Sequence, residues 1–335
     1  MGINHDHIKL SSSELSVLWG SYMNESLENC MISYFLKNVE DADIRTVLED
    51  ASNLAKRNMK AVTDLFKEEK IPVPLGFTEQ DVNLNAKKLF TDSFMLYYIQ
   101  IMGTLGLNLY SVSLSTSARK DIREFYTSCL TSSTDLFNRT SDVMQEKGLF
   151  IRPPFISYPT QIEFVEKQQF LAGWMGEQRP LTSIEVTSLF FNMYRNLLGY
   201  ALITGFSQVA QSKEVRQFMV RGAEMAKQHS EVTSELLRQD DLLTPMSWDT
   251  MPLTSKEAPF SDKLMMFQIA AMNAAGIGFY GTSIGVAARK DLALAYSRLF
   301  LEVGEYAADG AKILIDNGWL EKPFSVPDRK ELAEG

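Results

Sequence analysis

The most constraining feature of this sequence is that its first half is repeated in its second half. SARKDIREFY (Ser117–Tyr126) returns as AARKDLALAY (Ala287–Tyr296), 170 positions later. Earlier in each half the spacing is 171, which indicates that one residue was lost from a loop. The matches keep one order: Leu10, Ser12, Glu14 and Leu18 align with Leu181, Ser183, Glu185 and Leu189, and Ile99, Met102, Gly106 and Tyr110 align with Ile269, Met272, Gly276 and Tyr280. An ordered self-match over most of a chain indicates a tandem duplication.

Each half has the pattern of four helices. Apolar residues recur every three or four positions after Leu10 and again across Asp43–Phe66. Thr91 and its counterpart Ser261 are both followed by aspartate and are good N-caps for a third helix. A fourth helix should begin at the ARKD motif and end before a glycine, Gly148 or Gly318. Strand-like alternation is not evident, so we predict an all-α protein made of two tandem four-helix bundles.

The predicted domain organisation follows the repeat. We expect an N-terminal tail at 1–8, bundle 1 at 9–151, a linker at 152–180, bundle 2 at 181–326 and a C-terminal tail at 327–335. Prolines in the linker exclude one continuous helix, although IEFVEKQQFLAGWM could form a short amphipathic one. We expect the linker to pack across the bundles because it is rich in aromatic residues: Phe155, Tyr158, Phe164, Phe170 and Trp174.

The repeated ARKD motif predicts a corner between two helices. Cations favour the C-terminal end of a helix and anions the N-terminal end. We therefore expect Arg119–Lys120 and Arg289–Lys290 to end the third helices, and Asp121 and Asp291 to begin the fourth. The functional alternative is an anion site built from both Arg-Lys pairs.

Both third helices lack charge over long stretches, at 93–118 and 264–288. Each stretch is long enough to cross a bilayer, and Gly281 and Gly285 have a spacing suited to close helix contact. Polar residues such as Gln100 and Asn273 interrupt them, and no positively charged flank is evident. We predict central helices covered by their own bundle and by the other repeat or a second subunit, with no membrane insertion.

Composition excludes several functions and indicates a compartment. A net charge of −9 without a Lys/Arg stripe argues against nucleic-acid binding. Cys30 and Cys129 lie among apolar residues, which is typical of free buried thiols in a reducing compartment. The first ten residues contain no apolar leader. We therefore expect a cytoplasmic protein.

No catalytic or cofactor signature is present. Ferritin-like di-iron sites need two Glu-x-x-His motifs, and none of the three histidines, His5, His7 and His229, follows a glutamate by three residues. P-loop, GxGxxG, GxSxG and HExxH motifs are also absent. The sequence thus predicts a protein that is not an enzyme and has no cofactor, with a single metal ion as the remaining option.

A layer of polar residues is predicted inside each bundle. His229 and its counterpart Asn58 lie on apolar stripes, and Glu25 and Asn196 lie at equivalent positions on the first helices. Buried polar groups are costly unless they are paired. One reading is a hydrogen-bonded layer that fixes the helix register. Another is a metal or small-ligand site with His229 as one ligand, for which Asn196, Tyr296, Glu25 and Asn58 are the further candidates. A third is that the helical phase is wrong and these residues face solvent. Further candidates at this level are Tyr126, Asn273, Asn29 and Tyr200.

Two other groups are given a plainer interpretation. His5 and His7 lie in the predicted tail, where adventitious metal binding is the most that we expect. Glu302, Glu305 and Asp309, with Asp135 at the position equivalent to Glu305, could suggest a carboxylate cluster. Their spacing places them beside the apolar stripe, which predicts a solvated face.

Three segments carry a resemblance to a known family: FSDKLMMFQIAAMNAAGIGFYG, KGLFIRPPF and DNGWLEKP. They resemble an uncharacterised domain-of-unknown-function family of Bacillus-type spore formers, which is similar to the coat-F spore coat proteins. The resemblance covers about Leu10 to Asp328 and implies one or two ferritin-like four-helix bundles. It implies no activity.

Two functions remain open from the sequence. The first is a non-enzymatic structural or interaction protein, related to the spore coat or to stress, that forms homo-oligomers or binds a coat protein. The second is a metal- or small-ligand-binding bundle without di-iron redox chemistry.

Overall fold

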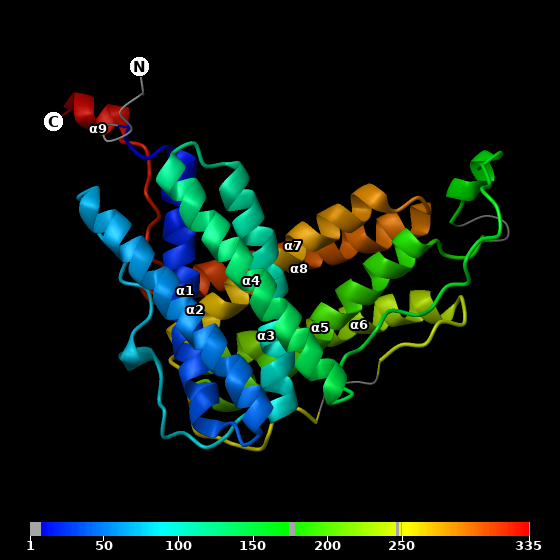
Figure 1. The fold of residues 1–335 in the computed structure, drawn as a ribbon, viewed down its shortest axis with the longest axis horizontal. Coiled ribbons are helices and arrows are strands. Elements are labelled where there is room, and N and C mark those ends of the chain that lie inside the picture. Colours follow the sequence, from blue (N-terminus) through cyan, green and yellow to red (C-terminus); the bar gives the residue numbers. More distant parts are fainter. Residues whose placement is uncertain (1–7, 174–177, 246–247, 249, 335) are drawn as a thin grey trace.

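The computed structural model describes residues 8–173, 178–245, 248 and 250–334, and this part of the chain is mainly helical (Figure 1). No β-strand occurs among the described residues. Matched helices of the two halves begin 170 or 171 positions apart, as the repeat predicts. The first repeat contains α1 (Ser12–Asn38), α2 (Ala42–Glu68), α3 (Asp92–Ser115) and α4 (Lys120–Glu146), and the second contains α5 (Ser183–Val209), α6 (Lys213–Arg238), α7 (Asp262–Val286) and α8 (Lys290–Asp316). A short helix, α9 (Arg329–Glu334), lies in the predicted C-terminal tail.

The same local signals set the helix ends in both repeats. A hydroxyl and a glutamate form a capping box at the first helix, and a hydroxyl caps the third helix. A glycine in the left-handed region follows the fourth helix, where a side chain would be strained. The residues are Ser11 with Glu14, Thr182 with Glu185, Thr91, Ser261, Gly148 (φ +66°) and Gly318 (φ +68°). The predicted third-helix caps and fourth-helix stops are confirmed.

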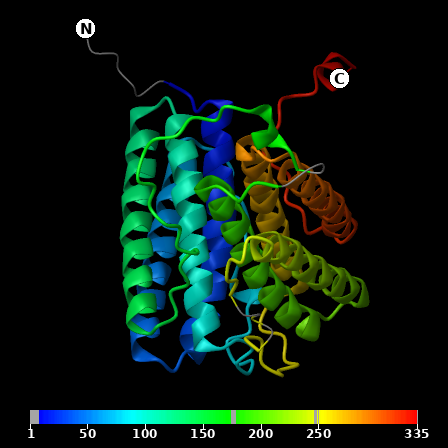
Figure 2. The same cartoon turned by 90° about the vertical axis from the view of Figure 1, so that its right-hand side faces the viewer.

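Each repeat is built from two helical hairpins, α1–α2 with α3–α4 and α5–α6 with α7–α8. The first repeat stands upright in Figure 1, and the second lies across it with α5 in contact with α3. In Figure 2 the helices of the first repeat run side by side, whereas the α7–α8 hairpin diverges from the α5–α6 hairpin. One large cluster of buried apolar side chains includes residues from both repeats. The two repeats therefore share a core.

The loops before the third helices join the repeats with approximate twofold symmetry. Val82 pairs with Phe260, and Phe90 pairs with Pro252, in isolated antiparallel bridges. Val82 is equivalent to Pro252 in the repeat, and Phe90 is equivalent to Phe260, so exchanging the repeats exchanges the two bridges. The backbone hydrogen bonds obey the same exchange: Thr91 N–H donates to the Met251 carbonyl (3.1 Å), and Ser261 N–H donates to the Asp81 carbonyl (2.9 Å). Such reciprocal contact is typical of a twofold dimer, here within one chain.

The prediction for the ARKD motif is wrong in one respect. Arg119 and Arg289 do not end the third helices but are the N-cap residues of α4 and α8. Glu14 explains this position. Its carboxylate accepts hydrogen bonds from Ser11 N–H (2.7 Å) at the start of α1 and from Ala118 and Arg119 N–H (2.9 and 2.7 Å) at the start of α4. One buried carboxylate therefore caps two helix N-termini, where exposed N–H groups favour an anion.

Glu185 plays the same part in the second repeat and also forms an ion pair. It accepts hydrogen bonds from Thr182 and Arg289 N–H, and Arg179 donates to both of its oxygens over 2.8 Å. Burial alone would raise the pKa of Glu185, but the hydrogen bonds from Arg179 and the backbone lower that pKa to about 2. The side chain of Arg289 pairs with Asp291 (2.7 Å). The arginine and the aspartate of the motif therefore pair with each other in both repeats.

The linker does not pack across the bundles as predicted. Phe155, Tyr158 and Phe164 are 75%, 84% and 87% exposed. Among the described residues of the linker, helical structure is limited to a short 3-10 helix, Gln168–Leu171, in which Phe170 stacks under the Arg179 guanidinium (3.9 Å). Trp174 lies outside the described residues. The helices bury their apolar faces against one another, and the prolines keep the linker from forming a helix that could join them.

The uncharged third helices are only partly central. The first half of α3 is buried, but Leu109 and Val112 near its end are 38% and 57% exposed. On α7, no atom of another described helix lies within 4 Å of the Cβ position of Gly281 or Gly285, so the predicted close helix contact is not made within this part of the chain. Among the described residues, α7 alone is long and apolar enough to cross a bilayer. Core helices pass that test too, so no membrane insertion is indicated.

Candidate functional site

The first repeat contains a buried polar layer centred on Glu25. Asn58 Nδ2 donates to Glu25 Oε1 over 2.8 Å, and the Tyr110 hydroxyl donates to the same oxygen. The three residues come from α1, α2 and α3. Burial raises the pKa of Glu25 to about 7, although both hydrogen bonds oppose the shift. The layer therefore holds a carboxyl group that titrates near neutral pH.

Glu28, almost one turn further along α1, is a second perturbed carboxyl group. The Tyr98 hydroxyl donates to Glu28 Oε1 over 2.8 Å, while Oε2 is buried and has no hydrogen-bond partner in the described part of the chain. Burial raises the pKa of Glu28 to about 8, and the nearby Glu25 charge adds to the shift. Glu28 is therefore largely protonated at neutral pH.

The second repeat has a different polar layer, to which each of its four helices contributes a residue. Asn196 Nδ2 donates to the Tyr280 hydroxyl over 2.8 Å, and that hydroxyl lies 3.0 Å from His229 Nδ1. His229 Nε2 lies 2.8 Å from Glu302 Oε2. Because a carboxylate only accepts, Nε2 carries the proton and Tyr280 donates to Nδ1. Burial lowers the pKa of His229 although Glu302 opposes this, which favours the neutral imidazole.

The other predicted members of these layers have different neighbours. The Tyr126 hydroxyl shares a hydrogen bond with Ser21 (3.1 Å). Tyr296 is buried with its ring 6.3 Å from that of Tyr280. Asn273 lies at the wall of a cavity, and Asn29 and Tyr200 are half-buried.

The five residues proposed as metal ligands do not form one site. Glu25 and Asn58 belong to the first repeat, whereas Asn196, His229 and Tyr296 belong to the second. Among the described residues, no group of three or more His, Cys, Asp or Glu side chains could hold a metal ion. Both ring nitrogens of His229 already make hydrogen bonds, so a metal ion would have to displace one of them. His5 and His7 lie outside the described residues.

Sequence reasoning missed two residues of the second layer: Tyr280, which entered only as the repeat counterpart of Tyr110, and Glu302. Glu302 was grouped with Glu305, Asp309 and Asp135 on a solvated face, and those three are exposed. Glu302 is instead half-buried between His229 and Arg298 (2.8 Å). Its repeat counterpart is Ser132, so the repeat gives no signal. The sequence signal that could have found Glu302 is its spacing of three residues from Leu299, which is buried.

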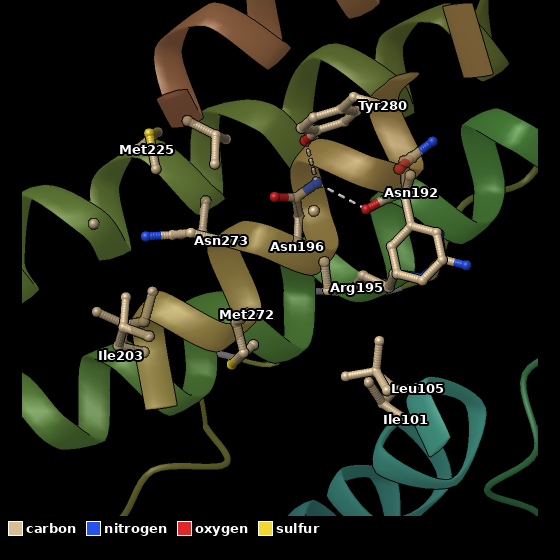
Figure 3. Close-up of a pocket in the computed structure, with 18 residues that line it drawn as sticks. Ile101, Leu105, Asn192, Arg195, Asn196, Ile203, Met225, Met272, Asn273 and Tyr280 are labelled. Carbon is tan, nitrogen blue, oxygen red and sulfur yellow. Dashed lines mark hydrogen bonds between the residues drawn. The ribbon is translucent and has the colours of Figure 1, made fainter. Parts of the chain in front are cut away.

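A cavity of about 90 Å³ adjoins this layer (Figure 3). Asn196 and Tyr280 lie at its wall, and Ile101 and Leu105 reach it from α3 of the first repeat. Its other walls are mostly apolar and come from α5, α6, α7 and α8: Ile203, Met225, Ala226, Ile269, Met272, Phe279 and Val303. Repeat counterparts at two lining positions are larger, since Glu28 corresponds to Gly199 and Leu105 corresponds to Ala275. These exchanges help to explain why the second repeat is hollow here.

Arg195 is the one charged residue among the described residues that line the cavity. Its guanidinium carbon lies 3.6 Å from the centre of the Phe279 ring and 5.9 Å from that of the Phe191 ring. Within the described part of the chain it has no hydrogen bond or ion pair. Burial lowers the pKa of Arg195 to about 10. Its counterpart in the first repeat is the neutral Asn24.

The fold and its two polar layers define a class: an all-helical protein made of two duplicated four-helix units that share a core. The chain belongs to the family described as "Protein of unknown function (DUF3231)", whose model matches residues 1–162 and again residues 169–332. The predicted membership in an uncharacterised family and the predicted duplication are thereby confirmed. No curated protein gives a significant match.

One solved structure is similar over part of the chain. It is a crystal structure of a "putative spore coat protein" from Bacillus halodurans, with 17% sequence identity and a TM-score of 0.42. The match covers 46% of this chain and 100% of the other. A likeness of this strength supports no functional argument.

Proposed function

We propose that the protein is a non-enzymatic binding protein that holds a small, mainly apolar molecule in the cavity of the second repeat. The cavity itself carries the proposal. Its walls are mostly apolar and a few polar groups meet at one side, which is the usual character of small-molecule sites. The cavity also lies where two helical hairpins and the other repeat meet, so a bound molecule would contact α3, α5 and α7 together.

The size of the cavity limits the ligand. A cavity of about 150 Å³ accepts benzene, and this one is about 90 Å³. The ligand is therefore a molecule that places a short aliphatic end in the cavity. The layer of Asn196, Tyr280 and His229 lies beside the cavity, and Tyr280 and Asn196 offer polar contacts at its wall.

The experiment uses the methionines as reporters. Methyl resonances of Met225 and Met272, which line the cavity, should shift in methyl NMR when 1-pentanol is titrated into the full-length protein. Those of Met31 and Met144, buried elsewhere, should not. Ala275→Leu should fill the cavity and remove the shifts, whereas Ala274→Leu, at the neighbouring exposed position, should leave them. Equal responses of all four methionines, or of both variants, would refute the proposal.

A single metal ion at His229 is the alternative ligand. It is less favoured because Tyr280 and Glu302 already occupy the two ring nitrogens. Metal analysis of untagged protein separates the alternatives. Stoichiometric metal that disappears in His229→Ala would favour the metal, and a metal-free preparation that still binds 1-pentanol would favour the cavity.

A structural or interaction role is the second candidate, and the exposed aromatic side chains of the linker favour it. In this proposal the chain is a ferritin-like bundle protein of a spore-forming bacterium, located in the cytoplasm or the forespore, and the linker contacts a second copy or a coat protein. Light scattering on the purified chain would test self-association. A larger species that Phe164→Ser reduces to the monomer would support contact between copies, and a monomer at all concentrations would contradict it.

A further inference from the structure

We infer that the ligand of the cavity carries a carboxylate group that pairs with Arg195. The inference rests on the proposed function and specifies the chemical class of the ligand. Its starting point is the unusual state of Arg195, a guanidinium with five N–H donors that makes no hydrogen bond or ion pair in the described part of the chain. The guanidinium instead contacts the aromatic rings of Phe279 and Phe191.

The four other arginines that are half-buried or buried all have polar partners. Three of them have counterions, and Arg45 donates to the Leu36 and Val39 carbonyls. Arg179 pairs with Glu185, Arg289 pairs with Asp291, and Arg119 pairs with Glu69 and Asp121. This is the expected behaviour, because removing a charge from water is costly unless the charge is paired. Arg195 departs from that pattern at the wall of a cavity that no described acidic residue lines. The missing partner is therefore best supplied by a ligand.

The geometry indicates which kind of anion fits. The face of the guanidinium stacks on Phe279, as its distance of 3.6 Å from the ring centre indicates. Stacking occupies a face of the planar group and leaves its edge N–H donors free. An edge of a guanidinium binds a carboxylate through two parallel hydrogen bonds. Ile101, Leu105 and Met272 would then contact the aliphatic body of the same molecule.

The test compares three ligands with the same five-carbon body. Pentanoate, 1-pentanol and pentylammonium are titrated into the full-length protein, with the Met225 and Met272 methyl resonances as the readout. Pentanoate should bind at least about tenfold more tightly than 1-pentanol, and pentylammonium should bind most weakly, since a hydrogen bond to a charged group contributes about 1.5–3 kcal/mol. Arg195→Met keeps the apolar stem and should remove the preference for pentanoate.

Arg221→Met is the matched control, because Arg221 also lies near aromatic rings but is paired with Asp309 outside the cavity. It should keep the preference for pentanoate. If 1-pentanol binds as tightly as pentanoate, the carboxylate is wrong although the binding function stands. If none of the three binds, both proposals fail. The wild-type series gives this answer even if Arg195→Met does not fold.

Discussion

Replacing Glu25 by glutamine should make the protein more stable at pH 8 and leave its stability almost unchanged at pH 4.5. Glu25 is 6% exposed, and burial raises its pKa from 4.5 to about 7. Because the folded-state pKa is above the unfolded value, folded protein keeps a proton that the unfolded chain releases as the pH rises. The free energy of unfolding therefore falls with rising pH between about 4.5 and 7.

The magnitude follows from the size of the shift. At about 1.4 kcal/mol per pKa unit, moving the pKa from 4.5 to about 7 corresponds to about 3 kcal/mol, which is an upper limit because Glu28 titrates in the same region. Glutamine avoids the cost of ionisation while its carbonyl oxygen still accepts the hydrogen bonds from Asn58 and Tyr110. The second repeat already carries an amide at this position, Asn196.

Urea denaturation followed by circular dichroism at pH 4.5, 6, 7 and 8 measures the effect. The advantage of Glu25→Gln over wild type should grow with pH and level off above pH 7. Glu305→Gln, an exposed change on α8, should show no such trend. A difference between Glu25→Gln and wild type that is constant from pH 4.5 to 8 would refute the assignment of a buried, perturbed carboxyl group.

Two further changes test the packing and the caps. Gly205→Ala should destabilise the protein by about 1–3 kcal/mol, because its Cβ would lie 2.5 Å from the Phe90 ring; Gly281→Ala, in open space on α7, should instead stabilise it by about 0.5–1 kcal/mol, and thermal denaturation compares the two. Glu185→Ala should cost about 3–5 kcal/mol because it leaves an arginine without its buried partner. Glu14→Ala loses hydrogen bonds from the backbone and from the Ser11 hydroxyl but no ion pair, and should cost about 1–2 kcal/mol. Equal losses for the two glutamates in urea denaturation would contradict the role of the ion pair.

The repeat made most of the fold predictable from sequence. Periodicity, caps and stop glycines are local signals, and they appear twice, so each copy supports the other. The structure adds a signal that only contacts reveal. Asp50 on α2 pairs with Arg139 on α4, and the equivalent positions in the second repeat hold Arg221 and Asp309, paired over 2.6 Å with the charges exchanged. The same ion pair is thus kept in both repeats, but the acidic and basic residues have exchanged helices. An alignment of the two halves therefore shows a mismatch at both positions and does not reveal the contact.

The parts of the site that could not be predicted depend on contacts between elements. Asn58 and His229 were placed in buried layers because their own helices have clear apolar stripes. Glu302 was missed because its burial depends on His229, a residue of another helix. The linker was misjudged because aromatic content does not show whether an uncovered apolar surface is available to receive it. Arg195 could not be predicted as a site residue, because the sequence does not show whether a charged side chain has a partner.

The two repeats have retained one fold but have changed its interior in opposite ways. In the first, Glu28 occupies the position of Gly199, and its side chain is fixed by Tyr98 inside the bundle. In the second, glycine at that position and alanine at 275 leave space, and the Asn196, Tyr280 and His229 side chains beside the space are uncharged and hydrogen-bonded. In the first interior the Glu28 side chain fills this position and offers a carboxylate no cation, whereas Arg195 in the second, which has no ion pair within the described residues, would attract one. If one copy carries the binding function, these substitutions indicate the second, while the first serves as the partner that closes the cavity with Ile101 and Leu105.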